Sequence, residues 1–455
     1  MWSPVLGDEA GTVTARLLAA LRRDITDGTL PPGARLPPHR DLAHRLGLGL
    51  GTVTGVYAEA ARQGLVTAHV GRGSFVAETA PLKRDTGALA MGQNVPPLEF
   101  TARRFAAALA RLRHHPGLAD QLSYAPPAGR DADRRAGALW LQQTSAFGRA
   151  DPEKLVVTTG AQQAIALAID MLCRPGDTIL TEAATYFGVR SIARAGGYTV
   201  RGLAMDGEGL LPAALDRAAA EGARVLYTLP TLQNPTGRIM SAARRAEIVA
   251  VARARDLWIV EDDLYSAFAL GTAPAPLSAL APERCFYING VSKAIAPGLR
   301  TGYLLLPDEA RVDQVVRLIR AQLYAPATLG TMVASQWIED GSAAEIVAEV
   351  QAEMAVRGDL AARLLGDAME KPADRRCPHL WLPMEELAAE RLAAQLLRHG
   401  IEVTPPAAPV VDASMISGVR LCIGALPDRI ALEAALTIVA TALKEETADR
   451  LLAVV

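Results

Sequence analysis

Cysteine is scarce in this sequence, and its four copies lie too far apart to form a metal site or a redox motif. Such isolated thiols, at Cys173, Cys285, Cys377 and Cys422, are typical of reduced, buried side chains in a cytoplasmic protein. No stretch of about 18 uncharged apolar residues occurs, so we expect no membrane-spanning helix. The first residues lack a basic stretch followed by an apolar run, so we expect no signal peptide and a cytoplasmic location.

The chain also lacks an overall excess of charge, because 47 Lys and Arg residues nearly balance 49 Asp and Glu residues. A polycation is excluded, so any binding to nucleic acid must be local. Residues 11–77 carry eight arginines against four acidic residues, a net charge of +4, which leaves the rest of the chain acidic. This asymmetry indicates an anionic partner for the N-terminal region.

The composition is that of a globular protein, with 50% hydrophobic and 21% charged residues, and 455 residues are too many for one ordinary domain. The spacing of apolar residues and of glycines predicts three helices, at 13–27, 38–46 and 51–63. Two short strands follow, at 64–67 and 74–76, around a tight turn at 71–73. Three helices followed by a strand pair is the element order of a winged helix-turn-helix.

The remaining sequence predicts an α/β domain. Apolar stretches at 225–229 and 257–260 have the pattern of strands buried on both faces, and a helical stretch at 242–255 lies between them, as in a largely parallel sheet. We therefore predict a winged helix-turn-helix domain at 1–78 and a Pro- and Gly-rich linker at 79–98. An α/β domain follows at 99–455 and ends in a smaller α+β subdomain at about 330–455.

Short motifs in the N-terminal region carry a family resemblance. They are GARLP at 33–37, RDLA at 40–43, GTVT at 51–54 and GRGSFV at 71–76. In this order they resemble the winged helix-turn-helix of the GntR family of regulators, which implies binding to double-stranded DNA.

The resemblance assigns Thr52 and Thr54 to a recognition helix in the major groove, and Arg35, Arg40 and Arg72 to contacts with phosphates. The family usually has a Ser-Arg pair and a further basic residue on this helix, whereas this chain has glycine or leucine there, at Gly49, Leu50 and Gly55. The alternative is a module retained for dimer packing or protein contacts.

Three motifs later in the chain carry reactive side chains next to apolar strands. They are QNPTG at 233–237, EDDLY at 261–265, and VSK at 291–293 followed by PGLR at 297–300. Together they resemble fold-type I aminotransferases, in particular the branch used in MocR-type regulators. The resemblance implies a large α/β domain with a mainly parallel sheet, a small C-terminal α+β subdomain and pyridoxal 5'-phosphate as the cofactor.

The resemblance also assigns roles to individual residues. Lys293 is a primary amine that forms a Schiff base with the cofactor. Asp262 pairs with the ring nitrogen, and Tyr265 and Asn234 bond the ring oxygen; Lys293, Asp262 and Tyr265 would be the catalytic residues. The phosphate would be held by the planar fork of Arg300, by Ser292 and by a helix start, at Ala161 and Gln162.

Three further residues extend the resemblance. Tyr186 corresponds to the ring-stacking aromatic, Tyr124 to a tyrosine that reaches the phosphate of a partner subunit in a homodimer, and Arg420 to the arginine that clamps a carboxylate. Simpler alternatives are a core aromatic for Tyr186 and an isolated ion pair for Arg420, and His379 is better explained as a packed core histidine. Ala161 and Gly290 stand where the family often has hydroxyl side chains, so we expect weakened cofactor affinity.

Three hypotheses for function follow. The first is a transcriptional regulator that senses an amino acid or amine through aldimine exchange at Lys293 and changes its DNA binding. The second is an active aminotransferase with a vestigial winged helix, and the third is a regulator that senses the cofactor itself. The presence of both modules in one chain favours regulation by analogy, while the retained site residues leave at least half-transamination chemically possible.

Overall fold

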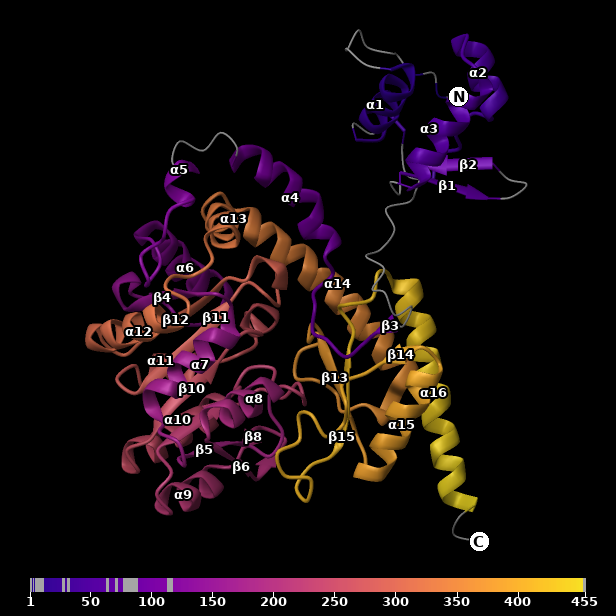
Figure 1. Cartoon of the computed structure of the whole chain (residues 1–455). Coiled ribbons are helices and arrows are strands. Elements are labelled where there is room, and N and C mark those ends of the chain that lie inside the picture. Colours follow the sequence, from indigo (N-terminus) through magenta and orange to yellow (C-terminus); the bar gives the residue numbers. More distant parts are fainter. Residues whose placement is uncertain are drawn as a thin grey trace. The chain divides into compact units, whose positions relative to one another are not determined.

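The computed structural model describes residues 2, 4, 12–26, 29–30, 33–62, 65–69, 73–76, 89–112 and 118–452. The chain divides into two compact units, Met1–Gly87 and Ala88–Val455, here called the N-terminal and the C-terminal unit (Figure 1). Among the described residues, no helix has the length and apolar character needed to cross a bilayer. Arg72, one of the predicted DNA contacts, lies outside the described residues.

The N-terminal unit has three helices and a two-stranded antiparallel sheet, namely α1 (Val13–Thr26), α2 (His39–Leu46), α3 (Leu50–Arg62), β1 (Val66–His69) and β2 (Gly73–Val76). Each helix turns an apolar stripe inward, and Leu17, Leu42 and Val53 are completely buried in the shared core. The order of elements is that of a winged helix-turn-helix, as the sequence predicts.

A seven-stranded sheet forms the centre of the C-terminal unit, in the order β4-β12-β11-β10-β9-β5-β6. Its strands are β4 (Leu155–Thr158), β5 (Thr178–Glu182), β6 (Thr199–Leu203), β9 (Val225–Thr228), β10 (Trp258–Asp262), β11 (Cys285–Gly290) and β12 (Gly302–Leu305). Only β12 runs against its neighbours, so the sheet is mainly parallel.

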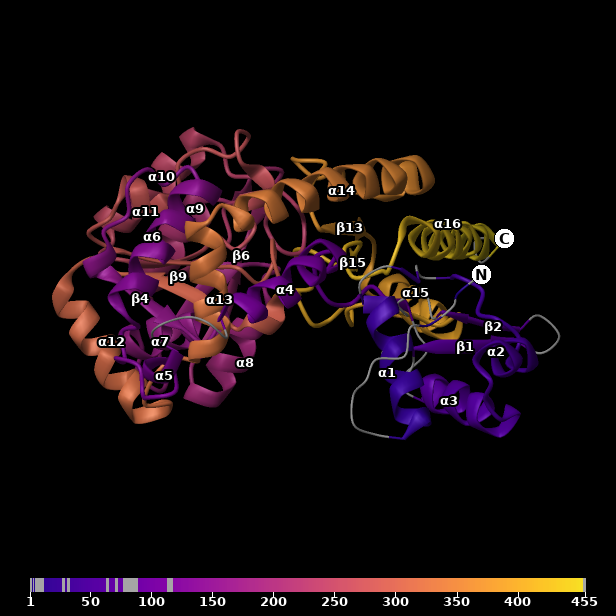
Figure 2. The same ribbon diagram turned by 90° about the horizontal axis from the view of Figure 1, so that it is seen from above.

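Helices cover both faces of this sheet (Figure 2). One face packs against α9 (Pro212–Ala220), α10 (Ala242–Ala254) and α11 (Leu277–Leu280), and the other packs against α6 (Asp131–Thr144), α7 (Ala161–Leu172), α12 (Glu309–Gln322) and α13 (Thr328–Glu339). Successive strand residues point to opposite faces, so Ile259 enters one apolar core and Val260 the other. Burial on both faces explains the continuous apolar strands of the sequence.

Shorter elements complete this part of the unit. They are α4 (Glu99–Leu112), α5 (Leu118–Gln121), α8 (Phe187–Gly196), the hairpin β7 (Met205–Asp206) with β8 (Gly209–Leu210), and short 3-10 turns at Pro152–Lys154, Ser266–Ala269, Pro297–Leu299 and Gly366–Ala368.

The C-terminal residues form a smaller α+β layer with two short sheets. β13 (His379–Pro383) pairs antiparallel with β15 (Gly418–Cys422), and β14 (Ile401–Glu402) pairs parallel with β3 (Leu89–Ala90). The helices of this layer are α14 (Ser342–Leu365), α15 (Glu386–Arg398) and α16 (Arg429–Leu452).

The predicted linker extends too far into the folded chain. Leu89 N–H donates to the carbonyl of Gly400 and Met91 N–H donates to that of Glu402, so residues 89–98 begin the C-terminal unit. A strand of two residues is too short to show a periodic pattern. The prolines and the glycine that follow it in residues 89–98 resemble those of a linker.

Candidate functional site

The carboxyl ends of β9, β10 and β11 meet at one edge of the sheet, because these three strands are parallel and adjacent. Asn234 follows β9, Asp262 ends β10, and Lys293 follows β11. These residues share one pocket, which is lined by Ala161, Gln162, Ile165, Tyr186, Leu229, Asn234, Asp262, Leu264, Tyr265, Ser292, Lys293, Pro297 and Arg300. The structure thus brings together every predicted cofactor-binding residue except Tyr124.

Asp262 is the buried acid of the pocket, with 4% of its surface exposed. Burial raises the pKa of its carboxyl group from 3.8 to about 6, although the hydroxyl of Tyr227 donates to Oδ2 over 2.7 Å and opposes the rise. The N–H of Leu264 donates to Oδ1 over 3.3 Å. These two donors hold the carboxylate in one orientation.

Lys293 supplies the primary amine. Its Nζ donates to the backbone carbonyl of Asn94 over 3.1 Å. Burial lowers the pKa of Lys293, and the positive charges of Arg420 and Arg300 lower it further, against the opposing effect of Asp262. A lowered pKa increases the fraction of neutral amine, which is the form that attacks a carbonyl carbon.

Arg420 enters from β15 and is almost completely buried. Its guanidinium donates to Asn234 Oδ1 over 2.8 Å, to the carbonyl of Gly92 over 2.8 Å and to Thr404 Oγ1 over 2.6 Å. An arginine has five N–H donors, and Nε of Arg420 is buried without a partner in the described structure. All three acceptors are neutral, so these contacts do not form the isolated ion pair that was the alternative explanation for Arg420.

The start of α7 forms one end of the pocket. Gly160 precedes the helix with φ +86°, and the Nη2 atom of Arg300 donates to the carbonyl of Thr159 over 3.0 Å. A Cβ atom on Gly160 would lie 2.6 Å from that Nη2, so only glycine lets the arginine approach this closely. Ala161, Gln162 and Ser292 line the same end, and free N–H groups at a helix start attract anions.

Tyr186 lies in the loop before α8, and its side chain lines the pocket. A Cβ atom on Gly188 would lie 2.2 Å from the Tyr186 ring, so the glycine makes room for the aromatic side chain. The amide of Gln162 donates to the carbonyl of Gly188 over 3.2 Å, and its Oε1 is buried without a partner in the described structure.

Tyr124 is the exception among the predicted residues. Its side chain is 80% exposed and its ring lies 4.7 Å from that of Tyr324, outside the pocket of its own chain. Its contact with the phosphate of a partner subunit stays a prediction.

Three pocket neighbours were not singled out from the sequence as site residues. Tyr227 holds Asp262, and Asn94 and His379 form a hydrogen-bonded pair beside Tyr265. His379 is completely buried, as expected of a core histidine, but its polar contacts connect it to the site. For Tyr227 the signal was its place on the strand that precedes Asn234; Asn94 gave no comparable signal.

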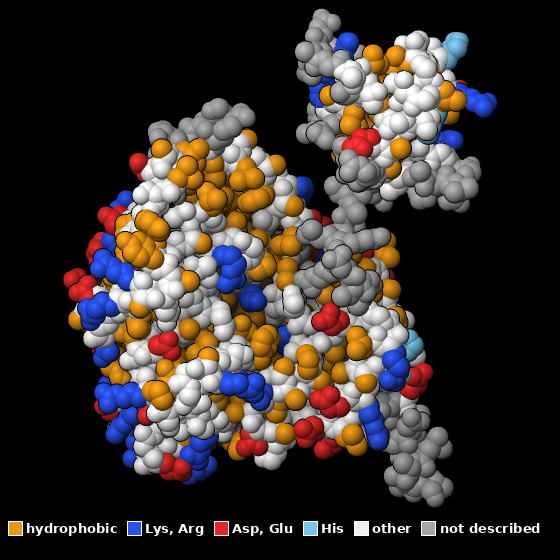
Figure 3. Space-filling model, in the orientation of Figure 1, with side chains coloured by type: hydrophobic (Ala, Val, Ile, Leu, Met, Phe, Trp, Pro, Cys, Tyr) orange, Lys and Arg blue, Asp and Glu red, His pale blue; other side chains and the backbone are white. Residues whose placement is uncertain are grey.

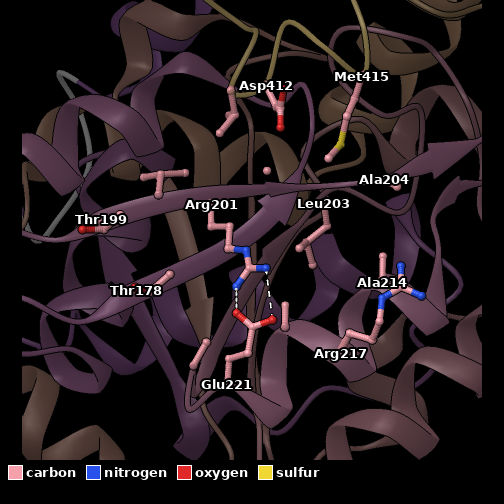
Figure 4. A pocket seen from close by; sticks show the side chains of 15 residues that line it. Thr178, Thr199, Arg201, Leu203, Ala204, Ala214, Arg217, Glu221, Asp412 and Met415 are labelled. Atoms are coloured by element: carbon pink, nitrogen blue, oxygen red, sulfur yellow. Dashed lines mark hydrogen bonds and ion pairs between the residues drawn. The ribbon is translucent and has the colours of Figure 1, made fainter.

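A larger hollow of about 720 Å³ lies beside the edge strand β6, compared with about 100 Å³ at Lys293. Figure 4 shows that Arg201 and Glu221 pair with each other there, while Arg217 lies further along. Its lining contains neither a lysine nor a buried acid, so its size does not make it the chemical site.

The predicted DNA contacts of the N-terminal unit are spread over its surface. Arg35 and Arg40 are exposed, Thr54 is exposed with its hydroxyl 3.2 Å from Nδ1 of His39, and Thr52 is half-buried. The departures from the family pattern, at Gly49, Leu50 and Gly55, also lie at the surface. The exposed part of α3 therefore presents small or apolar groups where family members usually have longer donors.

Comparison with known proteins identifies both parts of the chain. Residues 88–439 match the family described as aminotransferase class I and II, and residues 13–76 match the bacterial regulatory proteins of the gntR family. The structure is similar in fold to LysN, an α-aminoadipate aminotransferase from Thermus thermophilus, with a TM-score of 0.71, 24% identity and coverage of 81% of this chain and 96% of that one.

Several of the similar curated proteins are described as transcriptional or regulatory proteins, and the similarity covers most of their length. The chain is 28% identical to the uncharacterized HTH-type transcriptional regulator YdeF of Bacillus subtilis, over 78% of each chain. It is 29% identical to the pyridoxine biosynthesis regulator PdxR of Corynebacterium glutamicum, over 69% of this chain and 70% of PdxR. It is 25% identical to the probable rhizopine catabolism regulatory protein MocR of Rhizobium meliloti, over 72% and 71%.

The pocket fits the cofactor of such proteins. Its lining includes a primary amine of lowered pKa, a buried carboxylate, and a helix start beside an arginine. The Oε1 atom of Gln162, which lines the pocket, is buried without a hydrogen-bond partner in the described structure, as expected of a polar atom at a ligand site. With 88–439 matched, the chain belongs to the aminotransferase class I and II family, and it carries a gntR-family region at its N-terminal end.

Proposed function

We propose that this protein is a DNA-binding transcriptional regulator whose C-terminal unit binds pyridoxal 5'-phosphate and senses an amino acid or amine at Lys293. The observation that carries the proposal is the presence, in one chain, of a gntR-family winged helix and an aminotransferase-family unit whose pocket is lined by Lys293, Asp262 and Arg300. A helix-turn-helix of this family implies DNA binding, and membership of the aminotransferase family implies the cofactor.

The residues of the pocket divide the work of holding the cofactor. Asp262 would pair with the ring nitrogen, Tyr265 and Asn234 would bond the ring oxygen, Tyr186 would stack on the ring, and Arg300 with the start of α7 would hold the phosphate; all of these residues line the pocket. When bound, pyridoxal 5'-phosphate supplies an aldehyde that condenses reversibly with a primary amine, so Lys293 and an incoming amino compound compete for it.

Arg420 suggests that the effector carries a carboxylate. Its guanidinium donates to Asn234, which lines the pocket, and the acceptors of its hydrogen bonds are all neutral, so its buried charge is not balanced by a carboxylate. A carboxylate is the common ligand of a buried arginine fork, and a charged hydrogen bond of this kind contributes about 1.5–3 kcal/mol. Amino acids therefore fit the site better than simple amines.

The second candidate is an active aminotransferase with a vestigial winged helix. It is favoured by the completeness of the pocket, because Lys293, Asp262 and Tyr265 are the groups that transamination needs. The exposed face of α3, with glycines and a leucine in place of long donors, also fits a weakened DNA module. A regulator that responds to the cofactor alone is the third candidate, and it predicts no response to amino compounds.

A homodimer completes the proposal, in the cytoplasm where DNA is accessible. Large apolar side chains are exposed on the C-terminal unit near Tyr124, and Figure 3 displays hydrophobic side chains gathered over α4 and α13. Exposed apolar side chains on α4, on α13 and next to Tyr124 and Tyr324 in the chain include Leu109, Leu122, Leu323 and Leu329. Exposed apolar clusters of this kind typically mark interaction surfaces, and a second copy would bring Tyr124 to its partner's pocket.

The experiment uses purified protein with cofactor and two measurements on the same samples. A visible absorption band should be present, Lys293→Ala should remove it, and Lys371→Ala, at an exposed lysine, should leave it unchanged. A screen of amino compounds should then find one that changes both this band and the affinity for the DNA upstream of the gene. Removal of residues 1–80 should abolish DNA binding and leave the band.

The outcomes separate the candidates. Turnover of amino acids with an oxo acid, without salt-sensitive DNA binding, would establish the enzyme in place of the regulator. DNA binding that changes with cofactor concentration and with no amino compound would establish the cofactor sensor.

A further inference from the structure

The segment Gly92–Asn94 contacts two of the residues described above, because the carbonyl of Gly92 accepts from Arg420 and that of Asn94 accepts from Lys293. Asn94 is 8% exposed, and its backbone carbonyl accepts from Lys293. Its side-chain Nδ2 lies 3.0 Å from the hydroxyl of Tyr265 and 3.0 Å from Nδ1 of His379. A buried amide between two polar partners has only one orientation that satisfies both, and its neighbours determine which.

His379 determines the first step. Its Nε2 lies 3.0 Å from the backbone carbonyl of Gln233, and because a carbonyl only accepts, Nε2 must carry the hydrogen. Burial lowers the pKa of His379 to about 3, so the ring is neutral and Nδ1 carries no hydrogen. Nδ1 is therefore an acceptor, fixed as such by the fold.

The amide of Asn94 follows from this tautomer. Its Nδ2 has two hydrogens, and both have acceptors, one in Nδ1 of His379 and one in the oxygen of Tyr265. The opposite orientation would place Oδ1 against the lone pair of Nδ1. The orientation that remains leaves Oδ1 buried without a partner in the described structure, so the two donor contacts are what hold it.

A second amide reaches Tyr265 with its orientation fixed in the same way. Oδ1 of Asn234 accepts from Nη1 of Arg420 over 2.8 Å, and an arginine can only donate. The Nδ2 group of Asn234 therefore faces Tyr265, at 3.4 Å from its hydroxyl oxygen. The two amides approach the same oxygen from different parts of the chain.

We infer that Asn94 and His379 are positioning residues that make Tyr265 an obligatory hydrogen-bond donor to the ligand in the pocket. With Asn94 and Asn234 donating to its oxygen, the hydrogen of Tyr265 is directed to the remaining side, where the pocket lies. This inference rests on the proposed binding of the cofactor at Lys293. Donation to a phenol oxygen also makes its own O–H a stronger donor, because hydrogen bonds in a chain polarise one another.

The consequence is measurable in the cofactor. A donor to the ring oxygen stabilises that oxygen as an anion, and this lowers the pKa of the pH-dependent change in the visible band. Loss of the Asn94 contact weakens the donor and should raise that pKa by about half to one unit, the equivalent of one ordinary hydrogen bond. The pKa of His379, at about 3, lies far below the range of such a titration.

The test is a pH titration of the visible band in holoprotein variants. Asn94→Leu and His379→Leu should both raise the midpoint, and Tyr265→Phe should raise it more. Because Asn94 acts through Tyr265, the double variant should have the midpoint of Tyr265→Phe alone. Gln93→Ala, at the exposed neighbouring residue, is the matched control and should match the unaltered protein. Arg420 and Asp262, whose charges reach Tyr265, are the same in every variant.

Each outcome decides between defined alternatives. An unmoved midpoint in Asn94→Leu, or shifts that simply add in the double variant, would overturn the inference, because Asn94 would then act independently of Tyr265. If Asn94→Leu fails to fold, as judged by circular dichroism, the His379→Leu titration gives the same decision. A protein without any Lys293-dependent band would instead overturn the proposed function, which is a separate and visible result.

Discussion

Replacement of Asp262 by asparagine should stabilise the cofactor-free protein at neutral pH. The carboxyl group is 4% exposed, and its pKa is raised from 3.8 to about 6 by burial. A shift of about 2 pKa units corresponds to about 3 kcal/mol that the ionised carboxylate costs the folded state. Asparagine has nearly the same shape and carries no charge; its Oδ1 can accept from the N–H of Leu264, and the hydroxyl of Tyr227, which can donate or accept, can accept from its Nδ2.

The pH dependence gives this prediction its sign. Because the pKa in the folded state lies above the unfolded value of 3.8, the folded state binds the proton more tightly. The destabilising effect is therefore complete above about pH 6 and disappears as the pH falls toward 3.8. We expect the advantage of Asp262→Asn in the free energy of unfolding to be near its full value at about pH 8 and near half of it at about pH 5.

The assay is urea unfolding of cofactor-free protein, followed by the fluorescence of the tryptophans in the C-terminal unit. These are Trp140, Trp258, Trp337 and Trp381. Asp367→Asn, at an exposed aspartate, is the control and should change stability little at either pH. An Asp262→Asn protein that is no more stable than the original at pH 8, or a difference independent of pH, would refute the argument.

With the cofactor present, the same substitution should have the opposite effect. Loss of one partner from a buried charged pair costs about 2–5 kcal/mol, so cofactor affinity should fall about 30-fold or more. Equilibrium dialysis measures this directly. Opposite changes in stability and affinity would identify Asp262 as a residue retained for binding at the expense of stability.

Three further substitutions test other parts of the chain. Gly160→Ala places a Cβ 2.6 Å from Nη2 of Arg300 and should lower cofactor affinity about tenfold by dialysis, whereas Gly148→Ala, at φ +77° in open space, carries similar backbone strain and should not. Arg420→Leu should weaken the spectral response to amino acids about 10- to 100-fold and spare that to amines without a carboxylate; equal loss for both would contradict the clamp. Arg40→Ala should reduce the slope of log affinity against log salt for DNA by about 1, while an unchanged slope would mean that Arg40 contacts no phosphate.

The sequence predicted those site residues whose chemistry lies inside a short motif. Lys293 and Asn234 follow apolar strands and Asp262 ends one, and the parallel order of those strands brings the three residues to the same end of the sheet. The reactive group and its structural position are therefore encoded within a few residues of one another. The same holds for the winged helix, where apolar spacing alone predicts the three helices.

The residues that hold these groups in place could not be predicted in the same way. Asn94 contacts Tyr265 across 171 positions and His379 across 285, so only the folded chain brings them together. Asn94 also falls in the segment predicted to be a linker, because the strand before it is only two residues long and two prolines, Pro96 and Pro97, follow it. Neutral amides and a neutral imidazole carry no signature of their own, since the same residue types occur throughout ordinary cores and turns.

Gly290 departs from the family pattern, and the structure gives a reason for this departure that the sequence could not. The sequence shows glycine where the family often has a hydroxyl, which predicted a weaker phosphate site. In the structure Gly290 pairs with Gly302 of β12, and a Cβ atom on Gly290 would lie 2.9 Å from the carbonyl oxygen of Thr301. A Cβ atom on Gly302 would lie 2.7 Å from the carbonyl carbon of Gly160. These glycines bring β11, β12 and the start of α7 into backbone contact, so a side chain at Gly290 or Gly302 would push these elements apart.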